Sequence, residues 1–181
     1  MVKTTDIGRF YYYFPQAVTV VGVDRNVMPV AWHTPISAQP PLFGILVSPK
    51  RYTYSLLKQE DGFTVNFMDF NEASLIAKIG GTSGRDIDKL KKFKIAYKPG
   101  EEVNGVIITS SYAAYECEKH AEHVIGDHSL FVGKIIVIHY RKEIITLDGL
   151  IDEKKLLPML YFGKDRYITV NPQTTVVHKR G

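Results

Sequence analysis

Short runs of apolar and β-branched residues, separated by Pro, Gly and Asn, dominate the first third of the chain. Runs of this length and composition are typical of β-strands. Pro35 lies inside one of them, and because proline cannot donate to a ladder it predicts an edge strand, a bulge or a strand end. The pattern predicts strands at residues 17–23, 30–37, 42–48 and 63–67.

Two helices are predicted between the strands. The first covers residues 69–80, with Asp69 in a cap-like position and apolar residues recurring along one face. The second begins at Ser83, because Ser83 and Asp86 have capping-box spacing and the apolar residues that follow have a helical period. A shorter helix is predicted at residues 54–58.

Strands return in the second half of the chain, at residues 106–110, 114–124 and 129–139, with a turn at Gly126 and Asp127. Strand-rich halves that flank short helices, without regular strand-helix alternation, favour an antiparallel barrel over a Rossmann sheet. We therefore expect a mainly β, antiparallel barrel with inserted helices. A chain of 181 residues favours one domain, residues 1–181.

Composition narrows the class of protein. The chain is 45% hydrophobic and 23% charged, which is ordinary for a globular protein and excludes collagen-like and disordered chains. Cys117 is the only cysteine, so an intramolecular disulfide is impossible and a reducing compartment, the cytoplasm, is expected. No apolar run approaches the ~18 residues of a membrane span, so we expect no membrane partner. The net charge of +4 mildly favours anionic ligands.

The segment from Ser83 to Lys89 is the first candidate for binding an anion. At a helix start, free backbone N–H groups face outward, and Gly84 lets an anion approach them closely. Arg85 and Lys89 would add positive charge, with Lys89 as a mobile side chain. The alternative is a plain capping box formed by Ser83 and Asp86, with solvated lysines.

A second candidate lies at the junction after residues 42–48. Ser48, Arg51 and Thr53 place two hydroxyls and a guanidinium where a strand ends and a short helix begins. Thr53 has an alternative role as the cap of that helix. Two junctions of this kind in one small domain favour a bound phosphate ester.

Trp32, His33 and Thr34 precede Pro35 and combine the only tryptophan with polar side chains. A planar heterocycle needs an aromatic wall and a few fixed hydrogen-bonding groups, and this segment offers both. His128 follows the turn at residues 126–127 and is a candidate donor to a cofactor. The alternatives are a half-buried tryptophan on an amphipathic strand and a solvated turn histidine.

Other chemistries have little support. Gly-x-Ser-x-Gly, His-Glu-x-x-His, Walker A and Gly-x-Gly-x-x-Gly patterns are absent from the sequence. Glu118, His120 and Glu122 alternate along one predicted strand, a spacing that permits a metal but more simply describes a solvated face. We predict no metal site, and we expect Cys117 to be packed rather than nucleophilic.

The chain resembles the flavin reductase-like proteins with an FMN-binding split barrel, especially the flavoredoxin and ferric-reductase-like branch, over about residues 9–165. Each motif is short, and their shared order and spacing make the resemblance specific. The motifs are Tyr13-Phe14-Pro15, Asn26 with Pro29 to Ser37, Pro40-Pro41, Ser48 to Thr53, Phe63 to Asn66, Ser83 to Asp86 with Lys89, and Gly126-Asp127-His128 before Phe131-Val132-Gly133.

The resemblance implies a Greek-key split β-barrel that forms a homodimer and holds non-covalent FMN near the subunit interface. It identifies His128 as a catalytic donor to the flavin. The implied FMN-contacting residues are Asn26, Trp32, Thr53, Lys89, His128 and Phe162, with Ala31, His33 and Thr34 beside Trp32, and Ser48, Arg51, Ser83 and Arg85 near the phosphate.

The resemblance also implies a reaction. NADH or NADPH reduces bound FMN, and a free flavin, an iron chelate or a protein accepts the electrons. A flavoredoxin-type electron carrier without its own NAD(P)H turnover is the alternative. A nucleic-acid-binding barrel is a third class, suggested by Lys91, Lys92 and Lys94, but the tyrosines that would stack bases lie far from them in sequence, so we expect no nucleic acid partner.

Overall fold

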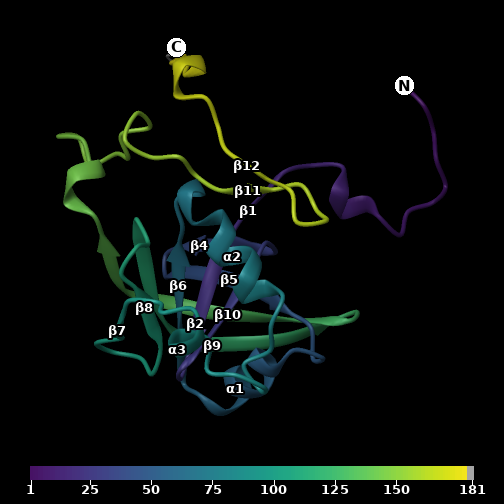
Figure 1. The fold of residues 1–181 in the computed structure, drawn as a ribbon, viewed down its shortest axis with the longest axis vertical. Coiled ribbons are helices and arrows are strands. Elements are labelled where there is room, and N and C mark those ends of the chain that lie inside the picture. Colours follow the sequence, from purple (N-terminus) through teal and green to yellow (C-terminus); the bar gives the residue numbers. More distant parts are fainter. Residues whose placement is uncertain (179–181) are drawn as a thin grey trace.

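A seven-stranded antiparallel sheet forms the body of the protein in a computed structural model that describes residues 1–178 (Figure 1). The strand order is β3-β2-β6-β9-β10-β5-β4, and long-range pairings such as β6 with β9 join distant parts of the chain. Its strands are β2 (Thr19–Val23), β3 (Asn26–Val30), β4 (His33–Ala38), β5 (Pro41–Val47), β6 (Gly62–Phe67), β9 (Ala113–Ile125) and β10 (His128–Tyr140).

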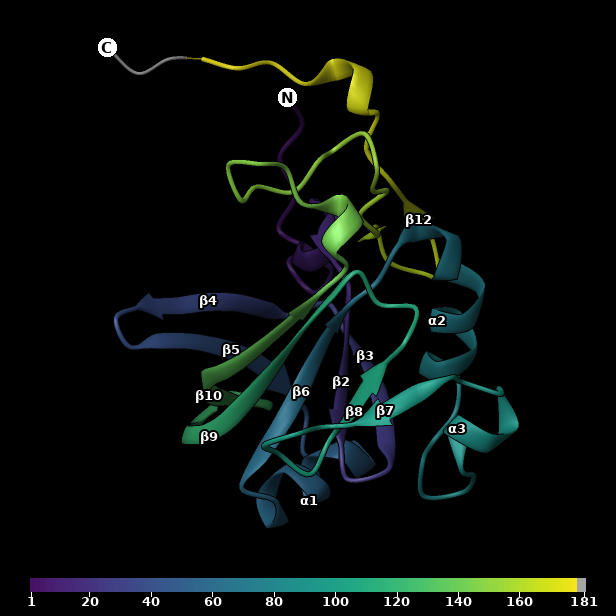
Figure 2. The ribbon, with the colours of Figure 1, turned by 90° about the vertical axis from the view of Figure 1, so that its left-hand side faces the viewer.

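Two small sheets and several short helices surround this body. The pair of α2 and α3 lies on the side of β3, while β4 and β5 project as an arm on the other side (Figure 2). The chain termini leave from the same end of the molecule, near β1, β11 and β12. The remaining strands are β1 (Gln16–Ala17), β7 (Tyr97–Pro99), β8 (Val106–Ile108), β11 (Leu160–Tyr161) and β12 (Tyr167–Ile168); the helices are α1 (Tyr52–Gln59), α2 (Ala73–Gly80) and α3 (Lys89–Lys92), with 3-10 turns η1 (Phe10–Tyr12), η2 (Phe70–Glu72), η3 (Lys142–Ile144) and η4 (Pro172–Thr174).

The mainly β, antiparallel fold class is confirmed, and so is the role of Pro35. β4 is an edge strand of the large sheet, where a missing N–H costs little. Its register with β5 also shifts between Pro35 and Ser37. No helix among residues 1–178 is long and apolar enough to cross a membrane.

The single strand predicted at residues 30–37 is wrong. The structure has two strands there, because β3 ends at Val30 and β4 begins at His33. Ala31 and Trp32 carry the chain from one edge of the large sheet to the other, and the Trp32 carbonyl accepts a hydrogen bond from the Leu46 N–H at 2.9 Å. The apolar pattern of residues 30–37 does not show that the chain changes from one sheet edge to the other within it.

The helix predicted to begin at Ser83 is also wrong. The Ser83 carbonyl accepts hydrogen bonds from the N–H groups of Asp86 and Ile87, which close only one turn. Helix α3 begins at Lys89, where the Asp88 side chain caps it by accepting from the Lys91 N–H at 3.0 Å. Asp88 has extended backbone angles, so it separates the turn from the helix.

Two hydrophobic clusters form the core. One packs β2, β5, β6 and β10 against α1 through residues such as Phe63, Phe131 and Leu57. The other packs α2 and α3 against the sheet through residues such as Ile76 and Leu90. The polar side chain of Asn66 is fully buried in β6 and links that strand to its neighbours: Nδ2 donates to the carbonyls of Val20 and Val106, and Oδ1 accepts from the Ile108 N–H at 2.8 Å.

We predict that Asn66→Ala lowers the free energy of unfolding by about 2 to 4 kcal/mol, because it leaves buried backbone groups without partners. Chemical denaturation monitored by circular dichroism measures the loss. The matched control is Asn71→Ala, whose side chain is exposed. Equal stability of the two variants would contradict this role for Asn66.

Candidate functional site

A cleft of about 1070 Å³ opens where β3, β5, the start of α1, the segment after α2 and the β9–β10 turn converge. Its lining combines polar, charged and aromatic side chains. Hydroxyl and cationic side chains come from Ser48, Lys50, Arg51, Thr53, Ser83 and Lys89, and aromatic side chains come from Trp32, Tyr52, His128, Tyr161 and Tyr167.

Lys89 is a buried cation in the wall of this cleft. Only 4% of the residue is exposed, and its ammonium donates to the carbonyls of Val27 and Ile79, each at 3.0 Å. Burial, and secondarily the nearby charge of Arg51, lowers the pKa of Lys89 to about 8. The expectation of a mobile lysine is therefore wrong, since Lys89 is fixed by β3 and α2.

Thr53 faces the cleft from the first turn of α1. Its hydroxyl oxygen accepts a hydrogen bond from Asn26 Nδ2 at 2.9 Å, and the residue is only 2% exposed. Because the oxygen already accepts, the hydroxyl proton is available to a ligand in the cleft. Thr53 does not cap α1: the N-cap position is Arg51, which makes no side-chain cap bond.

Because Gly84 has no side chain, the side-chain amide of Asn26 can lie directly against its backbone. A Cβ at residue 84 would lie 2.0 Å from Asn26 Oδ1, so any side chain there would displace the amide. Asn26 Oδ1 is buried and has no hydrogen-bond partner among residues 1–178. The close approach of Gly84, rather than a helix start, therefore gives the segment its shape.

Trp32 and His128 form the core of the aromatic wall. Their rings lie 4.8 Å apart with an interplanar angle of 38°. His128 Nδ1 lies 2.7 Å from Asp127 Oδ1, and this hydrogen bond holds the pKa of the Asp127 carboxyl below its usual value. Trp32 also packs against Phe10 and Tyr11, with centroid distances of 6.2 and 5.7 Å.

The structure brings together most of the site residues predicted from the sequence. Asn26 lies directly behind the wall, hydrogen bonded to Thr53. The predicted residues that line the cleft are Ala31, Trp32, Ser48, Arg51, Thr53, Ser83, Lys89 and His128.

Besides Asn26, four predicted site residues do not line the cleft. His33 packs on Phe43, and burial lowers its pKa. Thr34 donates its hydroxyl to the Pro35 carbonyl, and the Arg85 guanidinium lies 5.9 Å from the ring centre of Tyr52. The fourth is Phe162, which is bonded through its backbone to Arg166.

Other residues of the cleft were not predicted. Lys50 lies within the motif from Ser48 to Thr53, so its positive charge could have indicated a place in the site. Tyr161 and Tyr167 reach the cleft from β11 and β12, and β11 pairs with β1 from the start of the chain. The pattern of residues near Tyr161 and Tyr167 does not indicate a pairing with a strand so far away in the sequence.

The possible metal-binding face on β9 has other partners. The Glu122 carboxylate accepts from Tyr54 at 3.1 Å and from Lys58 at 2.6 Å, both on α1. The β9–β10 register also shifts at His120, which interrupts the alternation of side chains. Within the described part of the chain, no group of three His, Cys, Asp or Glu residues is placed to hold a metal ion.

Comparison with known proteins identifies the class. The flavin reductase-like domain family matches residues 11–169, and the chain belongs to that family. The crystal structure of an FMN-binding protein from Thermus thermophilus with bound 1-cyclohex-2-enone is 34% identical, covers 98% of both chains and superposes with a TM-score of 0.85. Flavoredoxin from Methanosarcina acetivorans is 25% identical, with a TM-score of 0.82 and coverage of 94% of this chain and 91% of that one.

A protein of Pyrococcus abyssi without an assigned function is 34% identical over 122 residues, which are 67% of this chain and 70% of that one. The similar solved structures have the split-barrel fold, so the expected split-barrel architecture is confirmed. Membership of the flavin reductase-like family associates the chain with flavin-related redox chemistry.

We predict that Gly84→Ala destabilises the protein by about 1 to 3 kcal/mol, because the new methyl group overlaps Asn26. The matched control is Gly81→Ala in the same cleft, where the nearest atom to a new Cβ is 3.4 Å away and the backbone is helical. Thermal unfolding of both variants measures the difference. A Gly84→Ala protein as stable as Gly81→Ala would contradict the close contact.

Proposed function

We propose that the protein is an FMN-dependent oxidoreductase that takes reducing equivalents from NADH or NADPH and passes them to a flavin, an iron chelate or a protein. The observation that carries the proposal is a single cleft lined by cationic, hydroxyl and aromatic side chains, in which Asp86, Asp127 and Asp165 are the acidic members. FMN has the matching chemistry, with a phosphate at one end and a planar ring system at the other.

The residues present fit FMN rather than an uncharged ligand. Arg51, Lys50 and buried Lys89 supply positive charge for the phosphate. Thr53 supplies a hydroxyl proton that Asn26 leaves unused, and Ser83 adds a second hydroxyl. The buried cation from α3, held by carbonyls of β3 and α2, and the buried hydroxyl from α1 together form the proposed anion site.

At the aromatic wall, Trp32 provides a planar apolar surface and His128 provides a hydrogen-bonding ring. Asp127 holds the orientation of His128 through Nδ1, so Nε2 is the ring nitrogen left to a ligand. When bound, FMN supplies the hydride and electron transfer chemistry. The side chains bind and orient it and set its electrostatic surroundings, with His128 Nε2 as the proposed hydrogen-bonding partner of the ring system.

We propose a homodimer in the cytoplasm. Four apolar side chains, each at least 40% exposed, lie on β4 and β10 of one sheet: Ile36, Ile136, Ile138 and Tyr140. Exposed apolar residues gathered in this way mark interaction surfaces. The single cysteine, Cys117, is buried, and burial raises its pKa to about 12, which suits a protein that needs no disulfide.

Anaerobic mixing with NADH or NADPH tests the proposed reaction. We predict that the purified protein binds FMN, and that bound FMN loses its visible absorbance on mixing with one of the two nucleotides. Recovery of the absorbance on addition of free FAD or a ferric chelate then measures acceptor turnover. A protein that binds no FMN would contradict the entire proposal.

The electron carrier remains the second candidate, because the similar flavoredoxin from Methanosarcina acetivorans covers almost the whole chain. A carrier would keep the FMN-binding cleft without using nicotinamide nucleotides. Bleaching by dithionite or a reduced protein, but by neither NADH nor NADPH, would support the carrier and exclude the reductase.

We predict that FMN affinity falls about tenfold between pH 7 and pH 9, since Lys89 has a pKa of about 8 and loses its charge in this interval. The phosphate has its own transition near pH 6 and stays dianionic throughout. Quenching of FMN fluorescence measures affinity at each pH.

In Lys89→Met the affinity is lower at pH 7 and nearly independent of pH over the same interval. Lys92→Ala, on the exposed side of α3, is the control and keeps the wild-type profile. A wild-type affinity that does not change from pH 7 to pH 9 would exclude Lys89 from the phosphate site.

We predict that wild-type protein has twice the chain mass of 20.5 kDa by light scattering. Ile36→Lys shifts the mass toward the single chain, because it places a charge in the apolar surface. Leu147→Lys replaces a fully exposed apolar residue in another loop and leaves the mass unchanged. A monomeric wild type would contradict the dimer.

A further inference from the structure

A second cavity, of about 440 Å³, lies at the opposite end of the β9–β10 pair from the proposed flavin cleft. The cleft contains Asp127 and His128, at the turn between these strands. The cavity instead contains Ala113 and Ala114, at the start of β9, and His139, near the end of β10. Among residues 1–178, the two sets of lining residues have no member in common.

The carboxylate of Glu116 lies behind the imidazole of His139 and is fully buried. Its Oε1 lies 2.7 Å from His139 Nε2 and accepts from the Glu101 N–H at 3.0 Å. Its Oε2 accepts from the N–H groups of Glu102 and Val103, at 2.8 and 3.1 Å. Burial favours the protonated acid, but these hydrogen bonds outweigh it and keep the pKa of Glu116 below its usual value. Glu116 therefore has its partners within the protein and is not itself a ligand group.

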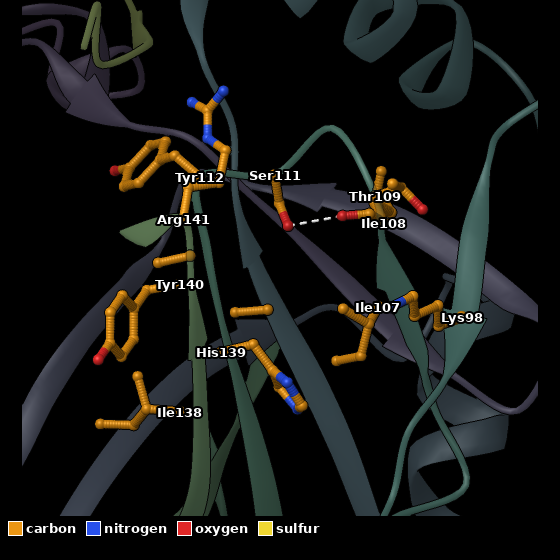
Figure 3. Close-up of a pocket in the computed structure, with 12 residues that line it drawn as sticks. Lys98, Ile107, Ile108, Thr109, Ser111, Tyr112, Ile138, His139, Tyr140 and Arg141 are labelled. Carbon is orange, nitrogen blue, oxygen red and sulfur yellow. Dashed lines mark hydrogen bonds between the residues drawn. The ribbon is translucent and has the colours of Figure 1, made fainter. Parts of the chain in front are cut away.

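The contact with Glu116 determines what His139 offers to a ligand. An ionised carboxylate is only an acceptor, so Nε2 carries the hydrogen and Nδ1 is an acceptor. Nδ1 has no hydrogen-bond partner within the described chain, and the side chain is 28% exposed. Figure 3 shows the ring pointing toward Ile107 and Lys98. The complement of this unused acceptor is a ligand that donates a hydrogen.

The charges on the cavity wall restrict the kind of donor. Lys98 and Arg141 line the cavity, and no acidic residue does so among the described residues. A cationic donor such as an ammonium group is therefore repelled, whereas a carboxylate has no hydrogen to donate to Nδ1. A neutral hydroxyl meets both conditions, because it donates one hydrogen and its oxygen carries a partial negative charge toward the cationic wall.

An apolar surface adjoins the free acceptor. Ala114 is the cross-strand partner of His139, and its small side chain leaves room beside the imidazole. Ile107 lies on the other side of that space, next to Lys98 (Figure 3). The volume of the cavity is within the ~300–1000 Å³ of ligand pockets. A ring with a hydroxyl group fits these walls better than a fully polar molecule does.

We propose that this cavity is a binding site for a neutral phenol, in which an aromatic ring carries the hydroxyl group. The hydroxyl donates its hydrogen to His139 Nδ1, and the ring packs on Ile107 and Ala114. An aromatic hydroxyl is a stronger donor than an aliphatic one because it is more acidic. Because Glu116 fixes the imidazole before a ligand arrives, little ordering cost arises at His139. The site does not depend on the proposed flavin chemistry.

Calorimetric titration with phenol, in the presence of saturating FMN, tests the proposal. Anisole is the matched probe, because a methyl group replaces the hydroxyl hydrogen while the ring stays the same. We expect saturable binding of one phenol per chain, and affinity at least about fivefold weaker for anisole, which corresponds to the loss of one hydrogen bond.

His139→Phe removes the acceptor and keeps an aromatic ring, while Glu116 retains its three backbone donors. We expect this variant to bind phenol at least about fivefold more weakly than the wild type, without preference over anisole. His123→Phe changes an exposed histidine elsewhere on β9 and leaves phenol binding unchanged. Circular dichroism and FMN affinity show whether each variant is folded.

A nuclear magnetic resonance titration of the wild-type protein needs no variant, because a hydrogen bond from phenol shifts the Nδ1 signal of His139 while Nε2 keeps its hydrogen. The proposal is overturned if phenol does not bind saturably at millimolar concentration, if anisole binds equally well, or if the Nδ1 signal does not move. It is also overturned if folded His139→Phe binds phenol like the wild type, or if phenol displaces FMN, which would place it in the other cleft.

Discussion

The hydrogen bond from Asn26 to Thr53, made possible by the missing side chain at Gly84, determines the shape of the proposed flavin cleft. It joins the first residue of β3 to the first turn of α1, and the segment after α2 closes over it. Each of these elements is held elsewhere by the core, so the polar contact fixes their ends relative to one another. The hydroxyl of Thr53 thereby faces the cleft with its proton unused.

Lys89 adds a second constraint in the same place. Burying an ammonium is costly, and its hydrogen bonds to the carbonyls of Val27 and Ile79 offset only part of that cost. The lowered pKa reflects the remainder. A phosphate bound in the cleft would stabilise this charge. The opposite arrangement holds at Glu116, whose charge is fully engaged by the protein's own N–H groups.

The sequence predicted the parts of this structure that depend on local pattern. Apolar runs located most strands of the large sheet, and Pro35 correctly indicated an edge. The Ser83 capping pattern failed because Asp88 is a competing cap, and because Gly84 serves a contact with a residue far away in sequence. The contact between Glu116 and His139 could not be predicted from the sequence. It depends on the register of β9 with β10, which shifts at two places.

The central claim is that the cationic, hydroxyl-rich wall binds the phosphate of FMN. Affinities of the protein for FMN and for riboflavin, measured side by side by fluorescence quenching at pH 7, test it most directly, because the two ligands differ only in the phosphate. The account predicts that FMN binds at least about 100-fold more tightly, as expected for a doubly charged group that meets several cationic and hydroxyl donors. Equal affinities for the two ligands would contradict it.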